Sequence, residues 1–200
     1  MDKLFDNKCI FAIIAIYEKT LGGTHPHLAQ LLNNLASLYK AQGKFEKAQE
    51  LCERALAIRE RVFGADHPDI AQSLNNLGSI YESRHRLAEA EKFYNRALQV
   101  WEKTLGFEHP HTATALNNLA CVYCSQQKYV EAEKLFERAL KIREKTLGPV
   151  HPEVVTVLRN MAQCYTENGN NKKAKELYQR IDQIKAKQVS TSDQIKPSER

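Results

Sequence analysis

Apolar side chains recur along the chain at the three- and four-residue spacing of a helix. The first clear series consists of Leu28, Leu31, Leu32, Leu35, Leu38 and Tyr39. This spacing predicts an amphipathic helix, because a half-buried strand would alternate apolar and polar positions. A turn at residues 42–44 follows, and a second apolar series from Phe45 to Ile58 predicts another helix, which ends at Gly64.

The whole pattern returns every 42 residues without insertion or deletion. Its most recognisable part is a central pair of asparagines, which recurs as Asn33-Asn34, Asn75-Asn76, Asn117-Asn118 and, in a looser copy, Arg159-Asn160. Each unit opens on a His-Pro pair, at His25, His67, His109 and His151. Proline suits the first turn of a helix, where its missing N–H costs nothing. The regular period predicts an all-α solenoid of antiparallel helix pairs, each buried only against its neighbours.

The repeat defines the expected domain organisation. We expect an irregular N-terminus at 1–8, a leading half-repeat at 9–22, repeats at 23–64, 65–106, 107–148 and 149–187, and a disordered tail at 188–200. The half-repeat is apolar all round, which indicates an extra partner: a missing upstream repeat, a second copy or a lipid surface. It is too short to span a bilayer.

Composition narrows the function classes. The chain has 200 residues, 42% apolar and 26% charged, and a net charge of +5 that is spread over every repeat. Nucleic-acid binders usually concentrate their basic residues, so we expect no nucleic-acid partner. Five cysteines, an odd number, and the lack of any Asn-x-Ser/Thr acceptor argue against a secreted disulfide framework and favour a cytoplasmic protein.

The repeated motifs resemble the tetratricopeptide repeat in its long 42-residue form, seen in kinesin light chains and nephrocystin-like proteins. The resemblance lies in His-Pro-x-x-Ala-x-x-Leu-Asn-Asn-Leu-Ala-x-Leu-Tyr and the Ala-Glu-x-Leu-x-x-Arg-Ala-Leu series that follows it, and it extends from residue 9 to about 187. It implies a right-handed superhelix whose first helices line a concave groove for peptides or disordered segments. Kinesin light chains also carry an upstream heptad coiled coil, and this sequence has none, so the resemblance alone does not imply a motor adaptor.

Asparagine is a poor helix former, so its repeated use in the first helix needs a reason. By analogy with tetratricopeptide grooves, we expect the second asparagine of each pair to face the groove and grip a peptide backbone, whereas the first turns partly toward the neighbouring repeat. A structural alternative is that both merely join the repeats. The predicted groove residues are Gln30, Asn34, Ser37, Lys40, Gln72, Asn76, Ser79, Thr114, Asn118, Cys121, Arg159 and Asn160. Each repeat should face about three residues of an extended ligand, and Lys40 and Arg159 favour an acidic one.

Several other residues could bind a metal, react or anchor a partner, but we prefer a structural interpretation for each of them. The four helix-start histidines stand one per repeat, too far apart to share a metal. Cys121 and Cys124 have redox-motif spacing but lie inside a helix, so groove lining is the preferred interpretation, with joint oxidation or soft-metal binding as the alternative. Trp101 replaces the arginine found at positions 59 and 143, and we expect it to pack at a repeat joint rather than to serve as an exposed anchor.

The sequence therefore predicts a non-catalytic interaction scaffold. It contains no phosphate-binding glycine loop and no nucleophile motif, so we expect no enzymatic activity, no cofactor and no small-molecule substrate. The expected partner is an extended, acidic protein segment, and a cargo-adaptor role like that of kinesin light chains is one form of this function. Two alternatives stay open: a regulatory module for an enzymatic or nucleotide-binding partner, and a membrane-associated or self-assembling element that uses the leading helix.

Overall fold

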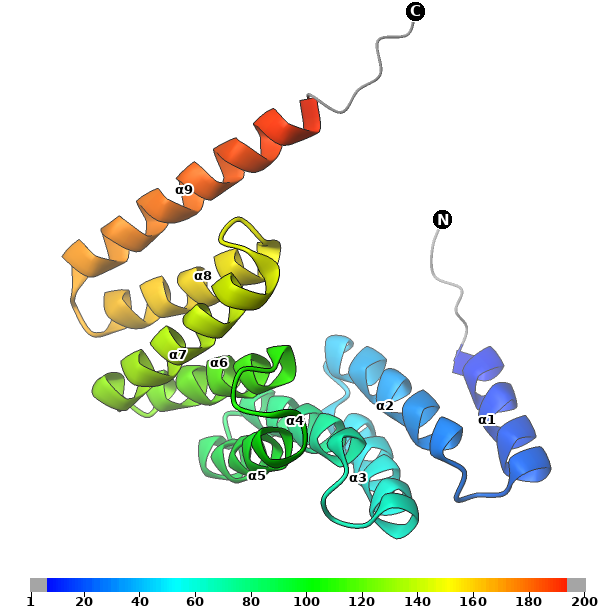
Figure 1. The fold of residues 1–200 in the computed structure, drawn as a ribbon. Helices are drawn as coiled ribbons and strands as arrows, with labels where there is room; N and C mark the ends of the chain where they lie inside the picture. The colour runs from blue at the N-terminus through cyan, green and yellow to red at the C-terminus, as the bar shows by residue number, and fades with distance from the viewer. Residues whose placement is uncertain (1–6, 194–200) are drawn as a thin grey trace, which may run out of the picture. The chain divides into compact units, whose positions relative to one another are not determined.

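Helices alone make up the secondary structure of residues 7–193, the part of the chain that this computed structural model describes (Figure 1). They are α1 (Asn7–Leu21), α2 (Pro26–Ala41), α3 (Phe45–Phe63), α4 (Pro68–Ser83), α5 (Leu87–Leu105), α6 (Pro110–Ser125), α7 (Tyr129–Leu147), α8 (Pro152–Glu167) and α9 (Asn171–Asp193). The first helices of the repeats are α2, α4, α6 and α8, and the second helices are α3, α5, α7 and α9. The prediction of an all-α repeat fold is confirmed.

The repeated histidines begin the first helices. Each is the N-cap residue, and its Nδ1 atom accepts a hydrogen bond from the backbone N–H two residues later, at 3.1 Å for His109 and 3.2 Å for the other three. The bond satisfies one of the N–H groups that a helix start leaves without a partner. The histidines thus have the structural role that the sequence indicated.

The turn inside each repeat requires a left-handed backbone at one position. Its φ angle is +73° at Gly43, +56° at His85, +62° at Gln127 and +74° at Gly169. Glycine occupies two of these four positions, and His85 and Gln127 adopt the same conformation at a cost of roughly 1 kcal/mol each. The turn therefore forms without glycine, but with some backbone strain.

The chain forms two compact units, Met1–Leu105 (the N-terminal unit) and Gly106–Arg200 (the C-terminal unit). In the N-terminal unit, α2 pairs with α3 and α4 with α5, while α4 packs on α3 and also contacts α2. Close approach depends on a small residue at Gly78, where an added Cβ would stand 2.7 Å from two ring carbons of Tyr94. The alternation of small and bulky positions is therefore a packing requirement.

The C-terminal unit repeats this arrangement with α6 to α9. Helix α6 pairs with α7 and α8 with α9, and α8 contacts both α7 and α6. A cluster of buried side chains joins α8 to α9 and consists of Val154, Val155, Leu158, Ile181 and Ile184.

Both ends of the array differ from the expected boundaries. Helix α9 continues to Asp193, so residues 188–193 are helical rather than part of a disordered tail, and the rest of the predicted tail lies outside the described residues. Helix α1 begins at Asn7, two residues before the expected half-repeat, and packs on α2. No helix among residues 7–193 is long and apolar enough to cross a membrane.

Candidate functional site

The first asparagine of the pair joins neighbouring first helices in one repeat of each unit. Asn33 is buried; its Nδ2 donates to Ser73 Oγ on α4 at 2.9 Å, and its Oδ1 accepts from the Cys52 thiol at 3.3 Å. In the C-terminal unit, Asn117 Oδ1 accepts from Asn160 Nδ2 on α8 at 3.1 Å. The prediction that this register turns toward the neighbouring repeat is confirmed for Asn33 and Asn117. The second bond also draws Asn160, a predicted groove residue, into a helix joint.

The second asparagine of each pair lies nearer the surface in the N-terminal unit, and its amide has a fixed orientation. Asn34 is exposed and Asn76 is half-buried. The Oδ1 atom of Asn34 accepts from Gln30 Nε2, and that of Asn76 accepts from Gln72 Nε2, both at 3.0 Å. Each glutamine bond fixes the orientation of the amide, so that its Nδ2 atom is placed to donate to a ligand, while the oxygen keeps one further acceptor site.

A pocket opens between α2 and α4. It has a volume of about 230 Å³ and is lined by Ala36, Ser37, Lys40, Ala41, Asn76, Ser79 and Ile80. Four of the twelve predicted groove residues, Ser37, Lys40, Asn76 and Ser79, therefore meet at one place. Lys40 reaches across the pocket, where its Nζ donates to Ser79 Oγ. This α2–α4 pocket combines a cation, an amide and two hydroxyls in front of a short apolar floor.

A half-buried carboxyl group lies near Lys40. Glu82 accepts a hydrogen bond from the Tyr94 hydroxyl at 2.7 Å. Burial raises the pKa of Glu82, while the bond from Tyr94 and the positive charge of Lys40 oppose the rise. The Lys40 ammonium thus already stands in the field of one carboxyl group of the chain itself.

Arg59 was not predicted as a site residue, yet its hydrogen bonds hold several groups of this region in place. Its side chain is only 2% exposed. Nη1 donates to the Asp69 carbonyl at 2.7 Å and to Ser73 Oγ at 2.9 Å, and Nη2 donates to Gln30 Oε1 at 2.7 Å. Burial lowers the pKa of Arg59, but a guanidinium stays charged in proteins. Arg59 therefore orients Gln30, which in turn orients the amide of Asn34.

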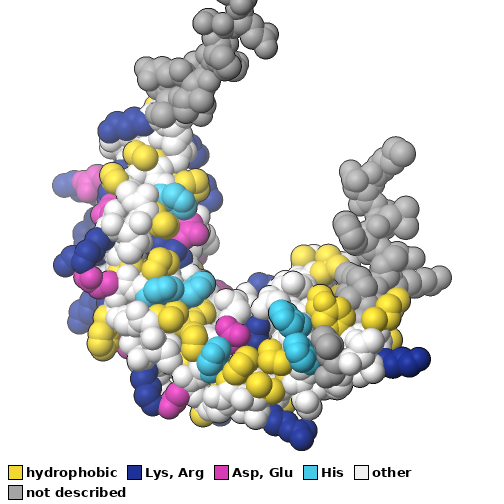
Figure 2. Space-filling model, turned by 45° about the vertical axis from the view of Figure 1, so that its right-hand side comes forward, with side chains coloured by type: hydrophobic (Ala, Val, Ile, Leu, Met, Phe, Trp, Pro, Cys, Tyr) yellow, Lys and Arg dark blue, Asp and Glu magenta, His cyan; other side chains and the backbone are white. Residues whose placement is uncertain are grey.

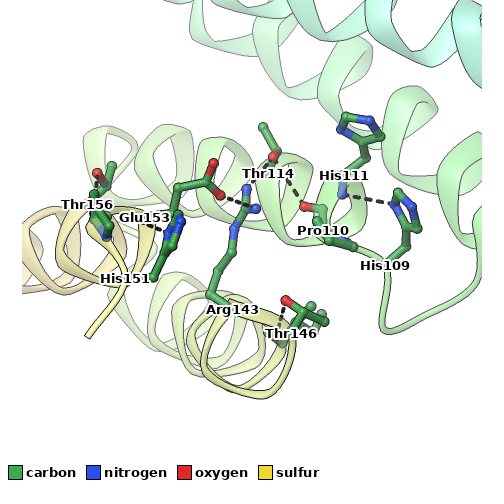
Figure 3. Close-up of polar contacts among 11 residues, drawn as sticks. His109, Pro110, His111, Thr114, Arg143, Thr146, His151, Glu153 and Thr156 are labelled. Atoms are coloured by element: carbon green, nitrogen blue, oxygen red, sulfur yellow. Dashed lines mark hydrogen bonds and ion pairs between the residues drawn. The ribbon is translucent and has the colours of Figure 1, made fainter. Parts of the chain in front are cut away.

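Arg143 occupies the same register in the C-terminal unit (Figure 3). Its Nη2 donates to Thr114 Oγ1 at 2.6 Å, and its Nη1 forms an ion pair with Glu153. Burial lowers the pKa of Arg143, and Glu153 opposes the effect. Thr114, a predicted groove residue, thus supports the arginine, and its own hydroxyl donates to the Pro110 carbonyl at 3.3 Å. The sequence does contain a signal for both arginines: a basic residue recurs at a repeat position that is otherwise aromatic, as at Trp101.

Trp101 stands at this register in the intervening repeat. Its side chain is 1% exposed, so it is buried as predicted and is not a surface anchor.

The remaining predicted residues of the C-terminal unit differ in exposure. Asn118 is half-buried and its Oδ1 accepts from Asn117 Nδ2 at 3.3 Å. Cys121 is half-buried, and Arg159 is exposed on α8. Their assignment to a ligand-binding groove stays a prediction.

The described residues contain no candidate metal site. No group of three or more His, Cys, Asp or Glu side chains in residues 7–193 is placed to hold a metal ion. Histidine side chains lie at the surface in both units, where they cap separate helices (Figure 2).

Comparison with known proteins identifies the repeat. The family model described as "Tetratricopeptide repeat" matches residues 12–51, 27–103, 69–145 and 111–181, and no curated protein matches significantly. A solved structure of a candidate kinesin light chain from Podosopora anserina with nearly identical TPR-like repeats aligns with a TM-score of 0.71 and 30% identity, covering 90% of this chain and 86% of that one. A solved structure of a substituted form of the same protein aligns with a TM-score of 0.74 and 30% identity, with coverages of 92% and 86%.

BtubC (BKLC) from P. vanneervenii is a further structural neighbour. It aligns with a TM-score of 0.72 and 27% identity, covering 88% of this chain and 69% of that one. The matched ranges run from residue 12 to residue 181 and include every repeat described above. The chain therefore belongs to the tetratricopeptide repeat family.

Proposed function

We propose that this chain is a non-catalytic interaction scaffold that binds an extended, acidic segment of a partner protein along its first helices. Tetratricopeptide repeats generally mediate contacts between proteins, and the structural neighbours are kinesin-light-chain-like. The observation that carries the proposal is the α2–α4 pocket, where Ser37, Lys40, Asn76 and Ser79 meet.

The polar groups of this region favour ligand groups that accept hydrogen bonds. Asn34 and Asn76 present Nδ2 donors, because the bonds from glutamines to their oxygens fix the orientation of both amides. Lys40 adds a positive charge on a stem long enough to leave Ser79 for a ligand. Backbone carbonyls and carboxylates of an extended peptide satisfy both kinds of donor. We therefore propose an acidic segment rather than a basic or purely apolar one.

In a cell, such a scaffold would connect two proteins. We propose a cytoplasmic adaptor role, of which cargo binding like that of a kinesin light chain is one form. This role rests on the resemblance of the repeats alone.

The direct test is a selection of ten-residue peptides from a random displayed library on the folded chain. We expect peptides rich in Asp and Glu, and we expect Lys40→Glu together with Asn76→Ala to weaken their binding at least tenfold. Raising the salt concentration should weaken binding too, since the contacts are charged.

The matched control is Arg61→Glu, which makes the same charge change at an exposed position of the second helix α3. This variant should bind the selected peptides as the wild type does. Equal losses in the two variants, or selected peptides without acidic residues, would contradict the proposal.

A second candidate function follows from Ile16 on α1. Its register is filled by Ile58, Val100, Ile142 and Ile184, which are 4–6% exposed, whereas Ile16 is 58% exposed. In the full repeats this position faces the interior of the helix pair, and α1 has no first helix of its own among the described residues. We propose that this face of α1 supports self-association or membrane contact.

Sedimentation and liposome flotation of the full chain and of Ile16→Asp separate these outcomes. Concentration-dependent sedimentation that Ile16→Asp abolishes supports self-association, and flotation that it abolishes supports membrane contact. A monomer that does not float, with or without the substitution, removes this second candidate.

A further inference from the structure

Two buried thiols meet between the first helices of the C-terminal unit. Cys124 lies on α6 and Cys164 on α8, each 6% exposed and neither in a disulfide. The two thiols lie close enough for each to affect the pKa of the other. Groove lining was the interpretation preferred for Cys121 and Cys124 from the sequence, with their joint oxidation as the alternative; the structure brings Cys164 of the next repeat close to Cys124.

A carboxylate completes the cluster. The Cys124 thiol donates to Glu167 Oε2 at 3.1 Å, and the other carboxylate oxygen accepts from Gln163 Nε2 at 3.0 Å. Glu167 lies on α8, as Cys164 does, so its contact with Cys124 also joins the two helices. The cluster therefore brings two thiols and one carboxylate together where α6 meets α8.

We propose that Cys124 and Cys164 form a reversible disulfide that links α6 to α8, and that Glu167 slows its formation. The inference concerns a covalent link inside the C-terminal unit, and it can be tested whether or not the first helices bind a peptide.

The reaction needs an oxidant, for which we propose a hydroperoxide. The Cys164 thiolate attacks the peroxide, the O–O bond breaks, and a sulfenic acid and an alkoxide form; the alkoxide takes up a proton. The Cys124 sulfur then attacks the sulfenic sulfur, the S–S bond forms, and the hydroxyl group leaves as water after taking up a proton. Two thiols and one hydroperoxide thus give one disulfide, one water and one alcohol.

A small cavity lies beside the Cys164 sulfur. It is lined by residues that include Tyr129, Glu133 and Met161, and its volume is about 10 Å³, close to what one water molecule needs. A peroxide could reach Cys164 through this cavity only if the cavity widened.

The surroundings of the pair keep it in the thiol form. Burial raises the pKa of both Cys124 and Cys164, and the negative charge of Glu167 raises both further. Glu133 on α7 acts on Cys164 in the same direction. Because the thiolate is the nucleophile, oxidation should be slow at neutral pH and faster in alkali. The pair then responds to sustained oxidation rather than to brief exposure.

The link would lie at the registers of the α2–α4 pocket. Cys124 corresponds to Lys40 and Cys164 to Ile80, each 84 residues later. If the first helices bind a peptide as proposed, oxidation fixes the floor of that surface in the C-terminal unit. This consequence rests on the proposed function, whereas disulfide formation does not.

The test is peptide mapping of the full chain after treatment with hydrogen peroxide at pH 8 under non-reducing conditions. Trypsin leaves Cys121 and Cys124 together on peptide 104–128 and Cys164 on peptide 160–172. We expect the two peptides to be joined in the wild type and in Cys121→Ser, and to stay separate in Cys124→Ser and Cys164→Ser. Oxidation should also raise the Tm of the wild type by roughly 5–10 °C, because the link closes a long loop.

Two outcomes would overturn the proposal. One is a bridge within peptide 104–128, which would mean that Cys121 and Cys124 pair instead. The other is that both peptides keep their thiols in the folded chain, while the same oxidant bridges the chain unfolded in urea.

Glu167→Gln tests the role assigned to the carboxylate, because glutamine keeps the shape and a hydrogen-bond acceptor but removes the charge. We expect this variant to form the bridge severalfold faster than the wild type at pH 8. Glu137→Gln, at an exposed position of α7, is the matched control and should leave the rate unchanged. Equal rates in Glu167→Gln and the wild type would show that Glu167 does not slow the reaction.

Discussion

Lys40 and Cys124 occupy the same position of the repeat, yet they give two parts of the molecule different chemistry. In the N-terminal unit, Lys40 reaches from α2 to Ser79 on α4 and lines an open pocket. In the C-terminal unit, Cys124 reaches from α6 to Cys164 and Glu167 on α8. The repeat thus determines which positions meet between first helices, and the individual residue determines whether the meeting point is a basic pocket or a thiol pair.

The same comparison applies to the buried arginines. Arg59 hydrogen-bonds to side chains on α2 and α4, and Arg143 contacts Thr114 on α6 and Glu153 on α8. In the repeat between them, Trp101 is buried at the equivalent position. A hydrogen-bonded cation and an aromatic ring therefore serve one packing position in this fold.

The largest effect is expected when the thiol pair of the C-terminal unit is introduced at the equivalent positions of the N-terminal unit. Lys40→Cys with Ile80→Cys should form a disulfide between α2 and α4 under the oxidising conditions that bridge Cys124 and Cys164, because the registers are equivalent. Non-reducing peptide mapping in a Cys124→Ser background would show the new bridge directly. The single variant Lys40→Cys is the control, and a double variant that keeps both new thiols would show that the two joints differ in geometry.

Loss of the buried arginine comes next. Arg59→Ala should lower the free energy of unfolding by about 2–4 kcal/mol, since it removes the arginine hydrogen bonds to Gln30 and the Asp69 carbonyl and opens a cavity, while Ser73 keeps only its bond from Asn33. Chemical denaturation monitored by circular dichroism measures the change. Arg61→Ala, on the exposed side of the same helix, should cost less than about 0.5 kcal/mol. Equal effects would mean that the Arg59 contacts contribute nothing specific.

A smaller effect is expected where α4 approaches α5. Gly78→Ala should destabilise the chain by about 1–2 kcal/mol, although alanine is the better helix former, because the new methyl group would stand 2.7 Å from the Tyr94 ring. The first repeat has Ala36 and Cys52 at the same two positions. In a Tyr94→Cys background, Gly78→Ala should therefore become neutral or stabilising. If Gly78→Ala still destabilises the chain in this background, the Tyr94 ring is not the cause of the destabilisation.

The smallest effect concerns the turn between α4 and α5. His85→Gly should stabilise the chain by about 0.5–1 kcal/mol, because glycine adopts the observed φ of +56° without strain. Gln127→Gly provides an independent repetition in the other unit, where φ is +62°. Thermal unfolding detects the gain as a small rise in Tm. A fall in both variants would show that side-chain contacts at these turns outweigh the backbone strain.

The sequence predicted the features that depend on period and local chemistry. Proline and histidine marked the start of each first helix, and the apolar period marked its buried face. The first asparagine was expected to turn toward the next repeat, and Asn33 does so. These predictions succeed because they need only helix geometry and one repeat length.

The features that it missed depend on contacts between separate helices. Arg59 looked like one charge on a polar helix, and only its place between Gln30 and Ser73 shows its role. The approach of Cys124 to Cys164 was missed, because spacing along one helix is visible in the sequence, whereas the approach of α6 to α8 is not.

The central claim, that a ligand lies along the first helices, is best tested by photo-crosslinking. A photoreactive amino acid at Ser37 in the α2–α4 pocket, or at Glu53 on the exposed side of α3, would be irradiated with an acidic peptide selected on the folded chain. We predict a covalent adduct from position 37 that unlabelled peptide prevents, and none from position 53. An adduct from position 53 alone would place the ligand on the second helices and contradict the proposed function.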